Sequence, residues 1–132
     1  MASGIYNIFK ANLMNGVVDL EADTILVALY DDSHAFTAGD TVYTTTNELP
    51  TADGYTQGGV AIAGKAVTAA ATTKWDGDNV AWTSATFTAA HAVIYTAGAG
   101  RIIASIDFGG DKTVTDGTFT IQWDADGIIT LA

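Results

Sequence analysis

The stretch between Asn79 and Asp111 constrains the fold most, because its side chains repeat with a period of two. It contains three apolar segments, 80–87, 92–95 and 102–108, which short polar or glycine-rich breaks separate. Successive side chains of a β-strand point to opposite faces of the sheet, so this period predicts strands with one buried face. In the third segment, one face carries Ile102, Ala104, Ile106 and Phe108, and the more polar face carries Ile103, Ser105 and Asp107.

The break between the second and third segments predicts a hairpin, because residues 96–100 are short and rich in glycine. Segment 118–123 alternates in the same way, with Phe119, Ile121 and Trp123 on one face. We expect this face and the apolar face of 102–108 to enter one core, with Trp82 or Val80 nearby. The opposite faces, which we expect to meet solvent or a partner, carry Thr118, Thr120, Gln122, Ser105 and Asp107.

Other short apolar segments are bounded by glycine and aspartate. Residues 24–30 form a nearly continuous apolar run, which is typical of a strand buried on both faces. Residues 41–43 are either a strand or the start of a short helix that runs to Leu49, and Pro50 ends either one. The remaining candidate strands are 17–20, 60–63, 66–70, 72–75 and 128–131. Turns are predicted at 21–23, 51–54, 76–79, 109–112 and 124–127, the last of which would close a hairpin into 128–131.

This spacing, with about eight or nine short strands and a turn signal about every ten residues, is typical of sandwiches, jelly rolls and barrels. The sequence therefore predicts a single all-β domain over residues 1–132. We expect an antiparallel β-sandwich or jelly-roll-like domain with one short N-terminal α-helix.

Charge and composition narrow the classes of partner. Fifteen acidic residues against five basic ones give a net charge of −10. Binding to nucleic acid requires clusters of Lys or Arg, so we expect no nucleic-acid partner. We also expect no membrane partner, because no apolar run approaches the ~18 residues of a membrane span. The absence of cysteine excludes disulfides, thiolate nucleophiles and Cys-ligated zinc.

Residues 3–15 form the one helix that the sequence predicts. Ser3 suits its N-cap and Gly16 suits its C-cap. Apolar residues at spacings of three and four give it one apolar stripe. The stripe either docks on the sheet or forms an arm that packs on another subunit. This candidate interface consists of Ile5, Ile8, Phe9 and Leu13.

The sequence offers few groups for catalysis. His34 and His91 have no recognisable partner, and no serine lies in a nucleophile elbow, so we predict no catalytic triad and no enzyme activity. We expect no cofactor.

Two acidic pairs, Asp76/Asp78 and Asp124/Asp126, invite comparison with calcium loops. Both lack the third acid and the distant Glu of an EF-hand loop. Asp-Gly steps are also the ordinary way to close a hairpin, so we expect turns rather than a metal site.

Six segments in order along the chain resemble small structural virion proteins of tailed bacteriophages. The first two are Lys10-Ala-Asn-Leu-Met-Asn-Gly16 and the stretch 19–29. The others are Gly-Tyr-Thr-Gln-Gly-Gly at 54–59, Ala-Val-Ile-Tyr at 92–95, Ile-Asp-Phe-Gly at 106–109 and Thr-Phe-Thr-Ile-Gln-Trp-Asp at 118–124. Together they span nearly the whole chain.

The resemblance implies a capsid decoration, or cement, protein. Such a protein binds the outside of the head lattice and stabilises the capsid, here without covalent links because the chain has no cysteine. The implied partner is the major capsid protein, and the implied location is the virion surface after synthesis in the host cytoplasm. We expect a homo-oligomer, either dimer or trimer, in which the apolar helical stripe is a candidate oligomer or capsid interface.

Two alternatives stay open. One is a carbohydrate- or receptor-binding module of a phage tail or fibre, with Trp75 or Trp123 stacking on sugar. Three exposed aromatic residues on one face would favour it. The other is a virion-associated hydrolase, which a pocket joining His34 or His91 to two carboxylates would favour.

Overall fold

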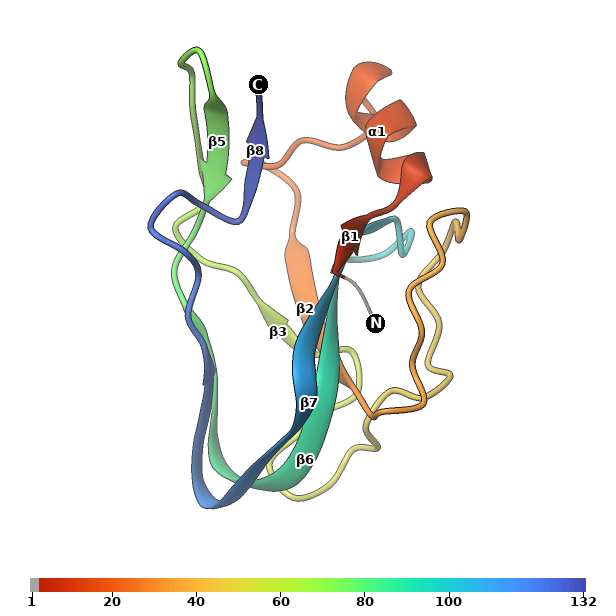
Figure 1. Ribbon diagram of the computed structural model, residues 1–132, viewed down its shortest axis with the longest axis vertical. Coiled ribbons are helices and arrows are strands. Elements are labelled where there is room, and N and C mark those ends of the chain that lie inside the picture. The colour runs from red at the N-terminus through yellow and green to blue at the C-terminus, as the bar shows by residue number, and fades with distance from the viewer. Residues whose placement is uncertain (1–2) are drawn as a thin grey trace.

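Two long strands form the centre of the molecule. The computed structural model describes residues 3–132, in which β6 (Val80–Thr96) and β7 (Ile102–Ile121) pair as an antiparallel hairpin. Their register runs from Tyr95 opposite Ile102 to Val80 opposite Ile121. The predicted pairing of 92–95 with 102–108 is confirmed, and it is one end of a much longer hairpin (Figure 1).

Three more strands extend this hairpin into a five-stranded sheet. β2 (Ile25–Tyr30) pairs with β6, β3 (Val60–Ala61) pairs with β2, and β1 (Gly4–Ile5) pairs with β7. All these pairs are antiparallel, and the strand order is β1-β7-β6-β2-β3. The prediction for 24–30 is confirmed, because five of the six residues of β2 are buried.

A second sheet contains β4 (Ala66–Thr68), β5 (Thr73–Asp76) and β8 (Ile129–Leu131), in the order β4-β5-β8. The last hairpin predicted from the sequence is wrong, because β8 pairs with β5 rather than with β7. Residues 122–128 instead carry the chain from one sheet to the other (Figure 1).

The predicted fold class is confirmed. All strand pairs are antiparallel, and the main core takes side chains from both sheets, such as Ile94 of β6 and Trp75 of β5. The two sheets form an open sandwich with one short helix, and the strands do not close into a barrel.

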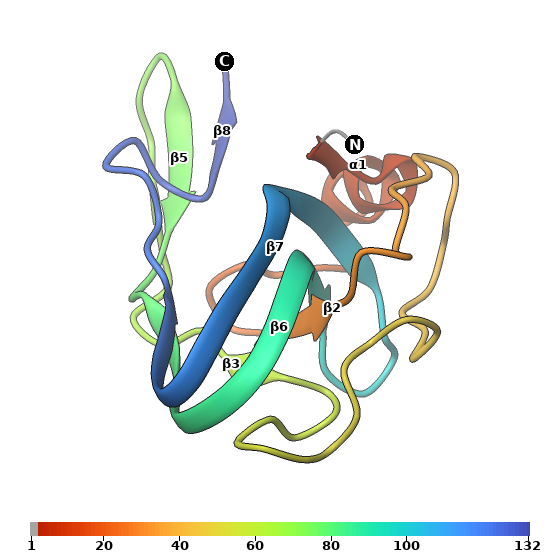
Figure 2. The same ribbon diagram turned by 60° about the horizontal axis from the view of Figure 1, so that its bottom comes forward.

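The β6–β7 hairpin bends near its middle, which Figure 2 shows from below. Pairing is irregular between Trp82 and Phe87, where the register shifts twice. Ser84 and Asp116 have φ angles of 48° and 46°, in the left-handed region. Such bulges bend a strand and increase its twist, so one hairpin can contribute to both sides of the sandwich.

Glycines on β7 add to this irregularity. Gly109 and Gly110 have φ angles of 80° and 137°. The turn predicted at 109–112 is wrong, because these residues lie inside a continuing strand. Glycine tolerates positive φ at little cost, so it can kink a strand without ending it.

The predicted core face is largely confirmed. Ala104 and Ile121 are buried in the main core together with Val80 and Trp82. Thr118, Thr120 and Gln122 are exposed, as expected. The partly buried residues packed against this core include Ile106, Phe108, Phe119 and Trp123.

Two residues of segment 102–108 do not follow the prediction. Ile94 lies opposite Ala104 while Tyr95 lies opposite Ile102, so Ile103 is an extra residue in β7. This bulge turns Ile102 to the other face of the sheet, where it joins a second apolar cluster. Ser105, expected at the surface, is only 2% exposed.

Helix α1 (Asn7–Met14) is shorter than predicted. Its N-cap position is Tyr6, which makes no side-chain capping bond, so Ser3 is not the cap. Ser3 Oγ instead accepts a hydrogen bond from the N–H of Asp107, 2.9 Å away. The chain leaves the helix through Gly16, whose φ of 68° fits the left-handed position that ends many helices.

Two further segments differ from the sequence prediction. Residues 17–20 are not a strand, although Val18 and Leu20 are buried in the main core. Segment 41–49 is neither strand nor helix and belongs to a long connection between β2 and β3. From this connection, Phe36 and Tyr43 pack against the second apolar cluster and cover the face of the five-stranded sheet that lies away from the main core.

A buried carboxylate fixes this connection to the sheet. Glu48 Oε2 accepts hydrogen bonds from the Tyr55 hydroxyl at 2.5 Å and from the N–H of Gly58 at 2.6 Å. The Tyr43 hydroxyl donates to Glu48 Oε1. The Tyr55 hydroxyl also accepts a bond from the N–H of Leu29 in β2, 2.9 Å away. Burial, followed by the bond to Glu48, raises the pKa of Tyr55 far above its usual range.

We predict that Tyr55→Phe destabilises the protein by about 1–3 kcal/mol, because a buried N–H and a carboxylate lose one shared partner. Urea unfolding measures the change. Tyr43→Phe is the matched control, since its ring is only partly buried and water can replace its bond to Glu48. Equal stability of the Tyr55→Phe variant and the unchanged protein would contradict a structural role for this network.

Candidate functional site

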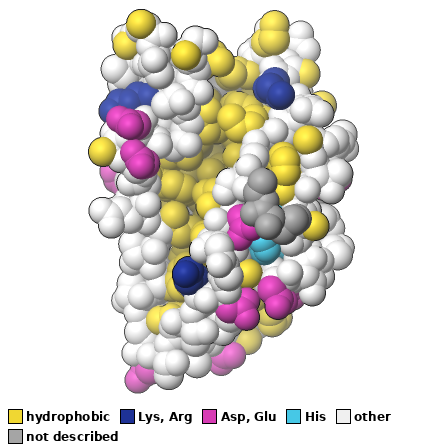
Figure 3. All heavy atoms as spheres, viewed as in Figure 1, with side chains coloured by type: hydrophobic (Ala, Val, Ile, Leu, Met, Phe, Trp, Pro, Cys, Tyr) yellow, Lys and Arg dark blue, Asp and Glu magenta, His cyan; other side chains and the backbone are white. Residues whose placement is uncertain are grey.

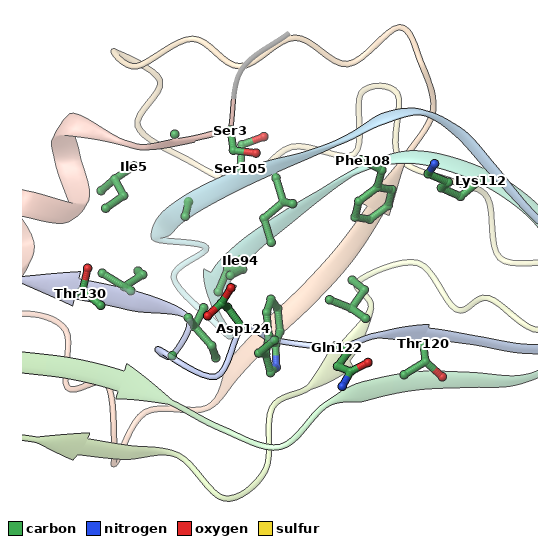
Figure 4. A pocket seen from close by; sticks show the side chains of 18 of the residues that line it. Ser3, Ile5, Ile94, Ser105, Phe108, Lys112, Thr120, Gln122, Asp124 and Thr130 are labelled. Carbon is green, nitrogen blue, oxygen red and sulfur yellow. The ribbon is translucent and has the colours of Figure 1, made fainter.

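An apolar cleft opens between the two sheets. Its larger part has a volume of ≈ 850 Å³ and is lined by residues from β1, β6, β7 and β8. Figure 4 shows this part from close by, with Ile5 and Thr130 at one end and Phe108 further along. Its apolar lining includes Ile94, Ala104, Ile106, Phe108, Phe119 and Ile121.

A second part, of ≈ 550 Å³, lies beside helix α1 and β5. Its lining includes Ile5, Ile129 and Thr130, which also line the larger part, so the two cavities adjoin. We call both together the inter-sheet cleft. In the space-filling view it is a long apolar hollow between the two sides of the molecule (Figure 3). The apolar lining of the second part includes Phe9, Leu13, Val18, Leu20 and Trp75.

Exposed apolar side chains concentrate at this second part. Ile5, Val67 and Leu131 line it and are 38%, 43% and 65% exposed. Two more exposed apolar residues, Met14 and Val17, lie at the end of helix α1. An exposed apolar patch with a polar rim is typical of a site for a protein partner or ligand.

The four residues predicted as an interface separate into three environments. Phe9 is buried in the main core, so the helix docks on the sheet. Ile8 packs against the second apolar cluster. Ile5 and Leu13 line the inter-sheet cleft, as Phe9 also does. The apolar stripe of the helix could not by itself predict the cleft, because β8 forms the wall opposite the helix.

Lysines lie along the cleft although the protein is acidic. Lys10 and Lys74 line the second part and Lys112 lines the larger part. These are three of the five basic residues of the chain. Asp19 and Asp124 are the acidic residues that line it. The charge along the cleft therefore differs in sign from the net charge of −10.

Both histidines lie in one polar cluster with Ser105 and Asp107. The sequence analysis did not predict this cluster. His34 Nε2 lies 3.1 Å from Ser105 Oγ, and the ring centroids of His34 and His91 are 5.1 Å apart. His91 Nδ1 lies 4.0 Å from a carboxylate oxygen of Asp107. Ser105 and His91 are buried, and the hydroxyl and the carboxylate contact different imidazoles. This arrangement differs from a Ser-His-Asp triad, in which one imidazole joins both groups.

The first acid of each of the two pairs, Asp76 at the end of β5 and Asp124, accepts a hydrogen bond from a nearby main-chain N–H. Asp76 Oδ1 accepts from the N–H of Gly77, and Asp124 Oδ1 accepts from the N–H of Asp126, both at 2.9 Å. Within residues 3–132, no group of three or more His, Cys, Asp or Glu is placed to hold a metal ion. Over the same residues, no helix is long and apolar enough to cross a membrane.

The tryptophans mainly serve packing, as the sequence predicted. Trp75 and Trp82 are buried, and the indole N–H of Trp75 donates to the carbonyl of Leu20. Trp123 is partly buried and lines the cleft, and its indole N–H donates to the carbonyl of Asp78.

Comparisons of the chain with protein-family models, with curated proteins and with solved structures found no match.

The histidine cluster gives a prediction about pH. Burial, and then the neighbouring His91, lower the pKa of His34 below its ordinary value of 6.5, although Asp40 and Asp31 act in the opposite direction. The unfolded chain therefore binds a proton more readily at this position, so stability falls as the pH falls below 6.5 toward the lowered value. The contribution of this group to the pH dependence fades as the pH rises above 6.5.

We expect His34→Gln to reduce the loss of melting temperature between pH 7.5 and 5.5 (about one unit either side of the ordinary pKa of histidine). Asp107 does not interfere, because the N–H of Gly109 holds the pKa of its carboxyl below 3.8. An unchanged loss of melting temperature in the variant would show that another group causes it.

Proposed function

We propose that this chain is a non-catalytic structural protein of a tailed bacteriophage, which binds the outside of the head lattice as a capsid decoration protein. The observation that carries the proposal is the inter-sheet cleft, an exposed apolar surface with free strand edges on both sides. A decoration protein needs a stable domain and a docking surface, and it needs no catalytic groups.

The resemblance to virion proteins also supports the inter-sheet cleft as the surface that contacts the capsid. Two of the segments that carry it, 106–109 and 118–124, contribute residues to the lining of the cleft, among them Phe108 and Trp123. A third, 54–59, holds Tyr55 and Gly58 in the Glu48 network. The resembling segments thus contribute both to the stable scaffold and to the surface proposed to bind the capsid.

The sugar-binding alternative has less support. Stacking on sugar requires exposed aromatic faces, whereas Trp75 and Trp82 are buried and Trp123 is only partly exposed. The hydrolase alternative also has less support, because Ser105 is buried and Asp107 faces His91 rather than His34.

The proposal predicts that Leu131→Asp weakens attachment to virus particles. The melting temperature should stay nearly unchanged, because Leu131 is 65% exposed and surface substitutions change the free energy of unfolding by about 0.5 kcal/mol or less. Cosedimentation of added protein with particles that lack it measures attachment. Val42→Asp is the matched control, because Val42 is 57% exposed and lies outside the cleft lining.

If both variants attach to particles equally well, the cleft is not part of the capsid contact. A reconstruction of intact particles that places the chain anywhere other than the outer head surface would overturn the decoration role itself.

We also propose that the assembled protein is a homo-oligomer, either a dimer or a trimer, because symmetric closed assemblies suit repeated lattice positions. Multi-angle light scattering should show an oligomer at high protein concentration or, if the lattice drives assembly, the particle reconstruction should show paired or threefold copies. A monomer in both measurements would contradict this.

A further inference from the structure

The inter-sheet cleft includes an edge strand, β8, in one of its walls. Ile129, Thr130 and Leu131 are the consecutive residues of β8, and all three line the cleft. The neighbouring strand β5 also lines the cleft, but it is paired on both sides, with β4 and with β8. β8 is the outermost strand of its sheet, so its second edge is open to an added strand.

The opposite wall of the cleft contains another edge. β1 is outermost in the five-stranded sheet, and both of its residues, Gly4 and Ile5, line the larger part of the cleft. Figure 4 shows Ile5 and Thr130 on the two walls. The cleft therefore lies where a further strand between the two sheets would lie. An open strand edge carries unpaired N–H and C=O groups that can pair with an added chain.

The charges along the cleft indicate the chemistry of that chain. Three lysines, Lys10, Lys74 and Lys112, line it against two aspartates, Asp19 and Asp124, on a protein whose net charge is −10. In Figure 3, Lys or Arg side chains border the apolar hollow on both sides. Apolar walls select apolar side chains, and the lysines select carboxylates near them.

We propose that the inter-sheet cleft binds an extended segment of a partner protein, which adds as a strand to the free edge of β8. The segment carries apolar side chains at alternate positions and carboxylates that meet the lysines. This inference rests on the proposed function, for which it names the recognition chemistry of the docking site. In strand addition, main-chain hydrogen bonds supply affinity and the pockets for alternate side chains supply specificity.

The test uses the full chain and a synthetic peptide, acetyl-Glu-Val-Thr-Val-Thr-Val-Glu-amide, followed by NMR. We expect the amide signals of β8 to shift on titration and their hydrogen exchange to slow. Alternate N–H groups of a strand point to opposite sides. N-methylation of either the valines or the threonines should therefore abolish binding, while methylation of the other set preserves it.

Charge is tested on both molecules. A peptide with lysine at both ends should bind more weakly than the acidic one. Lys74→Glu should weaken binding of the acidic peptide by about fivefold, the upper range for exposed ion pairs. Lys65→Glu is the matched control, because Lys65 is also partly buried but does not line the cleft, and it should leave affinity nearly unchanged.

Three results would overturn the inference. The first is that the acidic peptide fails to bind, and the second is that both N-methylated peptides bind as well as the parent. The third is that sodium decanoate binds in the cleft as tightly as the peptide, which would show that the cleft is a site for anionic amphiphiles. If the peptide fails while Leu131→Asp still weakens particle attachment, only strand addition is wrong. If the peptide binds β8 but particles do not carry the chain, only the proposed function is wrong.

Discussion

Continuous backbone pairing between β6 and β7 is the constraint on which the rest of the structure depends. Near the connecting turn, β6 also pairs with β2 and β7 with β1, which makes the five-stranded sheet. Beyond the bend, residues 80–82 and 119–121 stay paired and lead toward the second sheet (Figure 1). Bulges at Ser84 and Asp116 let the hairpin bend while most backbone groups keep their partners. The chain thereby encloses a core without closing a barrel.

The two faces of the five-stranded sheet are covered to different extents. On one side, the long connection after β2 covers the second apolar cluster, and the bonds of Glu48 with Tyr55 and Gly58 hold it in place. On the other side, the second sheet leaves a gap, and Ile5, Val67 and Leu131 remain exposed. Leaving apolar area in water forgoes about 25 cal/mol per Å², which a partner that covers it recovers. The covered side contributes to the stability of the fold, and the open side is the surface that we propose to bind a partner.

Sequence patterns predicted most of the strands and the faces of the core, because alternation acts locally. They failed where the backbone departs from a regular strand: the extra residue Ile103 turned Ile102 to the other face, and Gly109 kinked a strand instead of ending it. The partner of β8 was missed because β5 lies far away in sequence. The inter-sheet cleft and the contact of His34 with Ser105 depend on such distant pairings, so no local pattern contains them.

The distribution of charge would favour association through the open side of the five-stranded sheet. Copies of a protein with net charge −10 repel one another and other acidic surfaces at long range, although salt limits that repulsion to about 8–10 Å. Three of the five basic residues line the cleft, so the repulsion is locally relieved there. The apolar walls then supply attraction only at contact distance, and the free edge of β8 adds hydrogen bonds only to a chain that is extended. Acting in that order, these three terms would direct association to one surface and to one kind of partner.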